Sequence, residues 1–316
     1  MKYEPLQRGT VIGYRWIHDY GSQHSSEQLG PSDPRERSLL HSRISSSQPD
    51  GAYSLNIRIL GCHGSDAILQ HPTGPNRCNT CSFLLNGTLL LDAGTVGSKL
   101  SLSEQEQIRH IILSHLHFDH IKELPTLADN LSEEMSAPIV VAGIPEVIHG
   151  LQRHIFNTDV YPDFFSIPTP ERPTLTSSYL KPGNVYSFSG VDITPILVNH
   201  TVPTTGFIVQ DRSSAFVYSG DTYSTDELWH EAKHIPHLTT AFIECSFPNS
   251  MIELARMSKH LTPTLFAQEF RKLDRDDITV YAYHLKPAYR DQIVRELCEL
   301  SIPGLQVLEE DLTLTI

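Results

Sequence analysis

The chain has 316 residues, in which 24 lysine and arginine residues against 37 aspartate and glutamate residues give a formal net charge of −13. A protein that grips long nucleic acids through their phosphates usually carries a basic surface, so the acidic balance argues against such a partner. No apolar run reaches the roughly 18 residues of a membrane span and no apolar signal opens the chain, so we expect a cytoplasmic protein that does not cross a membrane.

Residues 1–53 differ in composition from the rest of the chain. Residues 22–50 are rich in Ser, Arg, Gln and Pro and show little apolar periodicity. We interpret residues 1–53 as an N-terminal arm that is partly flexible or serves as an oligomer contact. Gly13–Ile17 is a candidate strand or dimer contact within it, and a homodimer is expected. One folded domain is expected over residues 54–316.

Short apolar segments and helix-start signals alternate from Ser54 onward. Strands are expected at 55–60, 81–85, 88–91, 111–113, 138–142, 191–197, 206–209, 215–219, 241–244 and 280–283, where Val, Ile, Phe and Thr are frequent. A capping box at Ser224–Glu227, an N-cap and N1 proline at Thr262–Pro263 and a start at Lys286–Pro287 predict three helices. This order is typical of an α/β fold with two sheets covered by helices.

The segment from His154 to Gly183 does not fit this alternation. Five prolines within it argue against a long helix or a central strand, so we expect a loop or insertion. Its aromatic residues Phe156, Tyr161, Phe164 and Phe165 are candidates for a clamp around a purine ring, while packing in a core or at a dimer contact is the alternative.

The chemistry is expected at Ser114–His120, between an apolar strand and a helix. On an extended turn, His115 and His117 project to the same side, while Asp119 and His120 at the helix entry can face a second point. Two neighbouring divalent ions need six or seven ligands and a bridging carboxylate, so further ligands are required. His200, Asp221 and His284 each follow an apolar strand and are the candidates. Imidazole and carboxylate ligands suit zinc, manganese or iron.

The ligand pattern His-x-His-x-Asp-His, followed by separate His, Asp and His residues, resembles the metallo-β-lactamase fold hydrolases from Ser54 to the C-terminus. More narrowly, the chain resembles the class II 3′,5′-cyclic nucleotide phosphodiesterases. The supporting segments are Leu60–Gly64, Leu90–Thr95, His115–His120, Asn199–Pro203, Ser219–Thr222, Glu244–Asn249, His260–Thr262 and His284–Pro287. Phe118 and Glu123 depart from the family pattern, which has Leu and Gly there.

This resemblance implies an αββα sandwich of two mixed sheets flanked by helices, and a catalytic domain over residues 54–316. It implies one metal ion held by His115, His117 and His200, a second held by Asp119, His120 and His284, and Asp221 as the bridge. Zinc is the expected metal, with manganese or iron as alternatives. Asp92 would orient a ligand imidazole, or instead cap the turn before Gly94.

The implied activity is hydrolysis of cyclic AMP or cyclic GMP to a 5′-nucleotide by a metal-bridging hydroxide. His260 would be the acid and Asp119 a proton acceptor as well as a ligand. The alternatives are an RNA-processing phosphodiesterase similar to transfer-RNA 3′-end nucleases, an esterase or lactonase on the same fold, and a binding module with structural metals. The net charge argues against the first of these.

Several features of the sequence allow two interpretations. His63 is a possible active-site neighbour, and Gly61–Gly64 either cradles phosphate or forms a tight turn. Glu244 either contacts the surroundings of the metal cluster or is a buried salt-bridge partner. Cys78 and Cys81 have the spacing of half a zinc knuckle, but no second pair follows.

Overall fold

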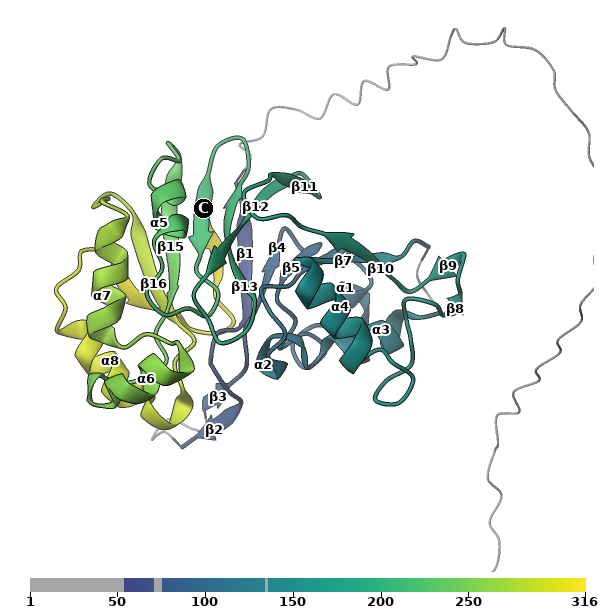
Figure 1. Ribbon diagram of the computed structural model, residues 1–316, viewed down its shortest axis with the longest axis horizontal. Helices are drawn as coiled ribbons and strands as arrows, with labels where there is room; N and C mark the ends of the chain where they lie inside the picture. Colours follow the sequence, from purple (N-terminus) through teal and green to yellow (C-terminus); the bar gives the residue numbers. More distant parts are fainter. Residues whose placement is uncertain (1–53, 71–75, 134–135) are drawn as a thin grey trace, which may run out of the picture. The chain divides into compact units, whose positions relative to one another are not determined.

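The computed structural model describes residues 54–70, 76–133 and 136–316 (Figure 1). The expected N-terminal arm lies outside the described residues. No helix in the described part of the chain combines the length and the apolar character that a membrane crossing requires.

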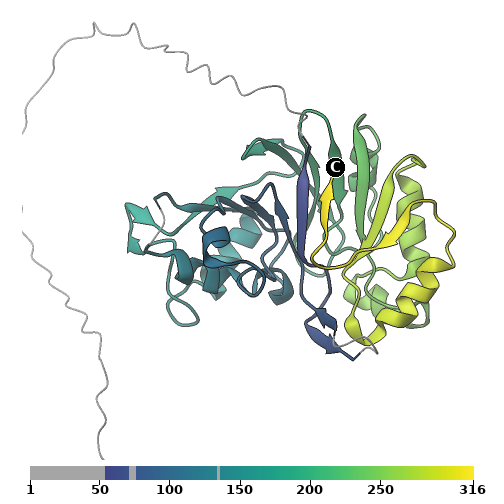
Figure 2. The same ribbon diagram turned by 180° about the vertical axis from the view of Figure 1, so that it is seen from behind.

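Two seven-stranded sheets form the centre of the fold. The first has the order β10-β7-β6-β5-β4-β1-β18, and the second has the order β11-β12-β13-β14-β15-β16-β17. Figure 2 shows β18, close to the C-terminus, beside β1. Parallel and antiparallel pairs occur in both sheets, as in β6 against β7 and β1 against β4, so both sheets are mixed.

The strands of the first sheet are β1 (Asn56–Gly61), β4 (Ser82–Leu85), β5 (Leu89–Leu91), β6 (His110–Ile112), β7 (Ile139–Gly143), β10 (Leu175–Tyr179) and β18 (Thr313–Thr315). Those of the second are β11 (Tyr186–Phe188), β12 (Val191–Val198), β13 (Thr204–Gln210), β14 (Ala215–Tyr218), β15 (Leu238–Glu244), β16 (Thr279–Tyr283) and β17 (Leu305–Val307). Two small hairpins pair β2 (Ala67–Leu69) with β3 (Asn76–Cys78) and β8 (Pro168–Thr169) with β9 (Arg172–Pro173). Every strand that the sequence predicted is present within a few residues.

Helices cover the outer faces of both sheets (Figure 1). They are α1 (Leu102–Gln105), α2 (Phe118–Ile121), α3 (Leu124–Leu131), α4 (Pro145–His154), α5 (Glu227–Ala232), α6 (Ile252–Ser258), α7 (Pro263–Lys272) and α8 (Arg290–Cys298), with single 3₁₀ turns at Asn249–Met251 and Pro287–Tyr289. One apolar cluster lies between the sheets, where Phe83 meets the rings of Tyr218, Phe242 and Tyr283. A second joins α3 and α4 to the first sheet, and a third joins α5, α7 and α8 to the second. The expected αββα arrangement is therefore confirmed.

Three local expectations are wrong. The segment 154–183 is not only a loop, because β10 pairs in parallel with β7 and forms the edge of the first sheet. The capping box at Ser224 does not form. The helix begins at Glu227, so Asp226 rather than Ser224 stands at the N-cap position, and it makes no side-chain cap. Thr262 does precede α7, but its buried hydroxyl has no hydrogen-bond partner among the residues that the structure describes and does not cap the helix.

Candidate metal centre

The ends of four strands bring the seven expected ligands together. They are His115, His117, Asp119 and His120 after β6, His200 after β12, Asp221 after β14, and His284 after β16. These strands belong to both sheets, so the two halves of the sandwich contribute to one site. In Figure 1, α2, which carries Asp119 and His120, is at the lower edge of the sandwich.

The first cluster consists of His115, His117, His200 and Asp221. One ligand atom from each lies within 4.8 Å of all the others. Nε2 of His200 is 3.1 Å from Nδ1 of His117, and Nε2 of His115 is 3.6 Å from Oδ2 of Asp221. The motif at 115–120 thus supplies two nitrogen atoms to one point, as the extended turn predicts.

The second cluster consists of Asp119, His120, Asp221 and His284. Nε2 of His284 lies 3.3 Å from Oδ2 of Asp221 and 3.4 Å from Oδ2 of Asp119. Nε2 of His120 is 3.4 Å from both the same oxygen of Asp221 and Nε2 of His284. Asp221 belongs to both clusters, so its carboxylate faces two neighbouring points.

These distances fit metal ions. Two ligand atoms that each lie about 2.1 Å from one tetrahedral ion are separated by about 3.4 Å. Nε2 of His115 and Oδ1 of Asp221 are also buried without a hydrogen-bond partner among the described residues. Buried polar atoms are normally paired. Two unpaired ligand atoms in the first cluster therefore fit a site that binds a cation. The residues present therefore fit a pair of divalent ions.

Hydrogen bonds behind the clusters fix the direction of four imidazole rings. The Nδ1 atoms of His115, His120, His200 and His284 contact Ser114 Oγ (3.0 Å), Asp92 Oδ2 (2.8 Å), the Lys259 carbonyl oxygen (3.0 Å) and Ser246 Oγ (2.9 Å), respectively. In these four rings, Nε2 is therefore the atom left for a metal. His117 is the exception, because its Nδ1 faces His200.

Asp92 has the contact that the orienting role requires. Its Oδ2 accepts hydrogen bonds from Ser114 Oγ at 2.9 Å and Tyr218 Oη at 2.9 Å in addition to the contact with His120, and its Oδ1 accepts the Ser114 amide at 2.8 Å. Asp92 is completely buried and has a φ of 57°. The alternative role as a simple cap of the following turn does not account for these contacts.

The electrostatics of the clusters favour cation binding. Burial lowers the pKa of His115 well below its ordinary value and that of His200 to about 4, so both rings are neutral at pH 7. Burial would raise the pKa of Asp221, but His284 and His120 beside it hold that pKa well below its usual range. Neutral imidazole and ionised carboxylate are the forms that bind a metal ion. His120 differs from the other two rings, because Asp221 and Asp92 outweigh its burial and raise its pKa, so this ring must release a proton when it binds a metal ion.

His260 lies beside the clusters and is held by Glu244. Its Nδ1 is 2.7 Å from Oε1 of Glu244, and its ring stacks on His284 with the ring centres 5.3 Å apart. Burial lowers the pKa of His260, but the Glu244 carboxylate outweighs burial and raises it. Ser246 Oγ donates to Oε2 of Glu244 at 3.0 Å and also contacts His284, so Glu244 connects His260 with a ligand. Both interpretations of Glu244, neighbour of the cluster and buried salt-bridge partner, thus apply.

His63 does not have a free ring to offer a substrate. It is 3% exposed, and its Nδ1 lies 3.0 Å from Oε1 of Glu310. His63 is a neighbour of the centre through its backbone, which bridges Leu285 beside the ligand His284, while its side chain contacts Glu310. The adjacent Gly64 packs on a ligand, since a Cβ there would lie 2.8 Å from Cε1 of His284. The segment Gly61–Gly64 is extended rather than a tight turn, because His63 bridges Thr80 and Leu285. It does not cradle phosphate either, since the amides of Cys62, His63 and Gly64 donate to backbone carbonyls.

Sequence reasoning missed two neighbours of the second cluster. The Cys81 sulfur lies within 4.8 Å of the ligand nitrogen atoms of His120 and His284, and no described ligand cluster contains both Cys78 and Cys81. The half zinc knuckle is thus not formed there, and Cys81 faces the histidines instead. The Lys286 ammonium lies 4.0 Å from Oδ2 of Asp119 and also donates to the Gly64 carbonyl. Its position two residues after His284 was the available signal.

The aromatic clamp is not present. Phe156 and Phe164 are each 2% exposed and belong to the apolar cluster of α3 and α4, with Tyr161 and Phe165 packed against them. The ring centres of Phe156 and Phe165 are 5.5 Å apart. The candidate clamp, with Phe164 as a substrate contact, is therefore wrong, and the alternative, packing in a core, is confirmed.

Comparison with known families adds an independent observation. The beta-lactamase superfamily domain matches residues 88–284, which is more than half of the chain and includes all seven ligands. The chain belongs to the beta-lactamase superfamily. With its two mixed sheets and flanking helices, it has the metallo-β-lactamase fold of hydrolases, a fold family that binds divalent metal ions.

The chain is similar in sequence to a yeast enzyme of known activity. The chain is 29% identical over 234 residues to 3′,5′-cyclic-nucleotide phosphodiesterase 1 of Saccharomyces cerevisiae, a match that covers 63% of this chain and 59% of the relative. The match thus spans less than two thirds of that relative's length.

Solved structures share the fold at lower identity. A crystal structure of unliganded yeast PDE1 has a TM-score of 0.67 at 21% identity, and covers 83% of this chain and 99% of its own. The metallo-β-lactamase fold protein YhfI of Bacillus subtilis has a TM-score of 0.65 at 17% identity, with coverages of 82% and 99%. Human tRNase Z, short form, has a TM-score of 0.58 at 16% identity, with coverages of 82% and 98%.

Proposed function

We propose that this chain is a phosphodiesterase that uses two divalent metal ions to hydrolyse a 3′,5′-cyclic nucleotide to a 5′-nucleotide. The observation that carries the reaction type is the shared Asp221, because one carboxylate that faces both clusters can bridge two ions. The substrate class is supported by the match to the yeast cyclic-nucleotide phosphodiesterase. Zinc as the metal, a homodimer and a cytoplasmic location remain predictions.

The two ions would be held by the two clusters described above, and when bound they supply activation of water and compensation of phosphate charge. The residues of this chain contribute proton transfers and orientation. Asp119, with 23% of its side chain exposed, is placed to accept a proton from the attacking water. His260 is oriented by Glu244, whose carboxylate raises its pKa, and is placed to donate a proton to the leaving 3′-oxygen. Lys286 adds a positive charge near Asp119.

The test uses the purified chain loaded with zinc and offered cyclic AMP, cyclic GMP, bis(p-nitrophenyl) phosphate and a transfer-RNA precursor. We expect hydrolysis of the cyclic nucleotides to 5′-nucleotides, loss of activity after chelation and recovery on addition of zinc. Cleavage of the RNA alone would refute the cyclic-nucleotide proposal and favour the RNA-processing alternative. Failure to cleave any of the four with both sites loaded would refute the enzymatic proposal.

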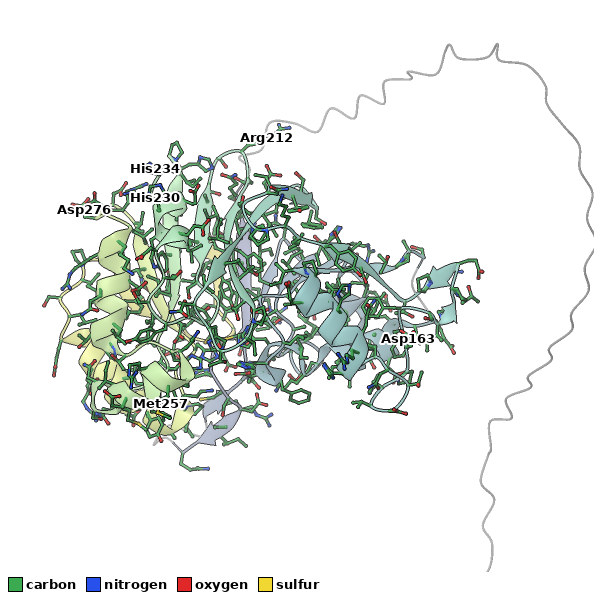
Figure 3. All side chains as sticks on the ribbon, viewed as in Figure 1. Asp163, Arg212, His230, His234, Met257 and Asp276 are labelled. Carbon is green, nitrogen blue, oxygen red and sulfur yellow. The ribbon has the colours of Figure 1, made fainter. Side chains whose placement is uncertain are left out.

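A single substitution tests the role of Asp119 in the reaction. Asp119→Asn removes the proton acceptor and one ligand oxygen, so we expect a loss of kcat of at least about 100-fold. Asp276→Asn is the matched control, because Asp276 is exposed at the surface (Figure 3). Equal activity of the two variants would contradict the role of Asp119.

A further inference from the structure

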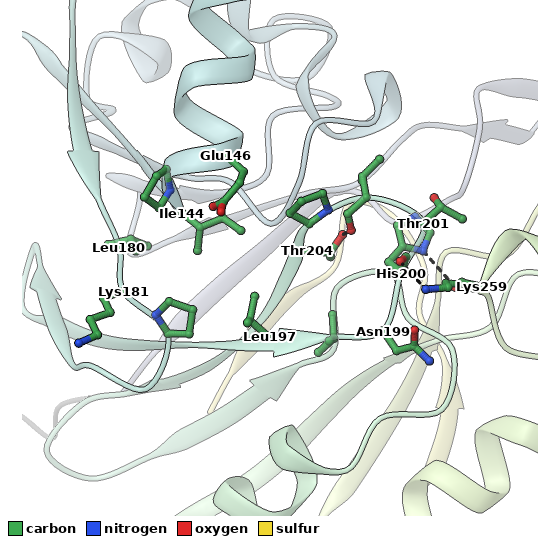
Figure 4. A pocket seen from close by; sticks show the side chains of 15 residues that line it. Ile144, Glu146, Leu180, Lys181, Leu197, Asn199, His200, Thr201, Thr204 and Lys259 are labelled. Carbon is green, nitrogen blue, oxygen red and sulfur yellow. Dashed lines mark hydrogen bonds between the residues drawn. The ribbon is translucent and has the colours of Figure 1, made fainter.

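A groove of about 840 Å³ begins at the first metal cluster and extends along the second sheet (Figure 4). His200, a ligand of that cluster, forms part of its wall, together with residues at the start of α4, after β10 and after β12. A volume of this size lies in the range of roughly 300–1,000 Å³ that small-molecule sites occupy. The groove is therefore continuous with the metal centre and large enough for the organic part of a substrate.

The walls are aliphatic rather than aromatic. They include Leu180, Leu197 and Val202, and the proline rings of Pro145, Pro182 and Pro203. Leu197 is 49% exposed, so its side chain presents apolar surface to the groove. Proline walls lose little conformational freedom when a ligand binds, which makes such a surface preorganised.

A few polar groups stand at defined places in the groove. Lys259 lies at the metal end, where its ammonium donates to the His200 carbonyl at 3.0 Å. Glu146 on α4 and Lys181 after β10 lie on different walls farther along the groove and are both exposed (Figure 4). These two side chains offer one acceptor and one donor to a polar heterocycle.

We propose that this groove holds the nucleobase of the cyclic nucleotide, an inference that rests on the function proposed above. With the cyclic phosphate at the two clusters, the ribose and base extend past His200 onto Leu197 and Val202. A flat, neutral heterocycle buries its faces against the aliphatic walls, and its ring nitrogen and amino groups meet Lys181 and Glu146 at the rim. The aromatic residues that were candidates for a clamp lie in a core. The aliphatic walls of this groove would contact the base instead.

The experiment compares two substrates that differ only in the base: cyclic AMP and the ribose 3′,5′-cyclic phosphate that lacks it. In Leu197→Gln, we expect a KM for cyclic AMP about five- to ten-fold higher, from the loss of apolar contact by a half-exposed leucine, and an unchanged KM for the abasic substrate. Leu312→Gln is the matched control, because Leu312 is 39% exposed and does not line the groove. Equal changes for both substrates, or none for either, would overturn the inference.

A binding measurement separates this inference from the proposed function. If the wild-type zinc enzyme cleaves bis(p-nitrophenyl) phosphate but no cyclic nucleotide, the proposed substrate is refuted. The groove is then tested by calorimetric titration of the zinc-loaded protein with 5′-AMP. A Kd that Leu197→Gln raises five-fold or more supports a base-binding groove, whereas equal affinities of the wild type and the variant overturn it.

Discussion

Asp92→Asn isolates the contribution of the carboxylate behind His120. Asparagine has nearly the same shape and tolerates the left-handed backbone found at this position, so the substitution adds little backbone strain. In the native protein, Oδ2 receives three donors and Oδ1 receives one. An amide has only one acceptor oxygen, and either orientation places its NH₂ group against at least one donor.

The expected magnitude follows from this mismatch. A buried donor that loses its acceptor costs about 1–3 kcal/mol, and a hydrogen bond to a charged group contributes about 1.5–3 kcal/mol. We therefore expect the free energy of unfolding of the metal-free protein to fall by about 2–4 kcal/mol. The metal Kd should rise about 10- to 100-fold, because substitution of residues that orient ligands has effects of this size.

Urea unfolding of the metal-free protein and zinc titration against a chromophoric chelator measure the two effects separately. Asp276→Asn serves again as the surface control. The reasoning is refuted if Asp92→Asn binds zinc with the wild-type Kd, because His120 would then be oriented without the carboxylate. A loss of stability without a change in metal affinity would refute the orienting role and leave a structural one.

Three further predictions concern other parts of the site and fold. Burial opposes ionisation of Glu310, but hydrogen bonds from His63, Asn79 and Lys99 outweigh it and lower its pKa. Its stabilisation is therefore present above the unfolded pKa of about 4.5 and is lost as the pH falls through the folded value, so urea unfolding of Glu310→Gln should show a deficit of about 1–3 kcal/mol at pH 7 that shrinks in acid. A pH-independent deficit would contradict this. His260→Asn should lower kcat about 10²- to 10⁴-fold with unchanged zinc content in elemental analysis, while exposed His234→Asn (Figure 3) should not. Phe164→Ala should lower the free energy of unfolding by about 3–5 kcal/mol with no change in KM for cyclic AMP, and a raised KM would restore the clamp.

The fold and the ligand set were predictable because their signals are local. The central strands are short apolar runs, and the ligands follow them directly in sequence, as Asp221 follows β14. β10 was missed because its sequence Leu-Thr-Ser-Ser-Tyr is mostly polar and half-buried, and only its pairing with β7 makes it a strand. The capping box at Ser224 failed because the helix begins at Glu227 after Asp226, so Ser224 and Glu227 do not stand at the N-cap and N3 positions.

Apart from Asp92, which the family resemblance implied, the residues that orient the ligands were not predictable in the same way. Ser246 and Lys259 contact ligands that are 38 and 59 positions away, and Tyr218 contacts Asp92 across 126 positions. Lys259 holds His200 through its backbone carbonyl at a φ of 54°, a conformation that its side-chain type does not suggest. Such contacts depend on how the two sheets meet, so no sequence spacing identifies them.

The net charge of −13 does not describe the local charge at the metal centre. Asp92, Asp119, Asp221 and Glu244 all contact the histidines of the site, and they contribute four negative charges to a volume that is mostly buried. Two divalent ions would supply four positive charges in the same place. An anionic phosphate would then meet the cations, with Lys259 and Lys286 beside them, rather than the average charge of the chain. The acidity of the chain argues against long polyanions that must follow its surface, but not against a small phosphodiester that reaches only the centre.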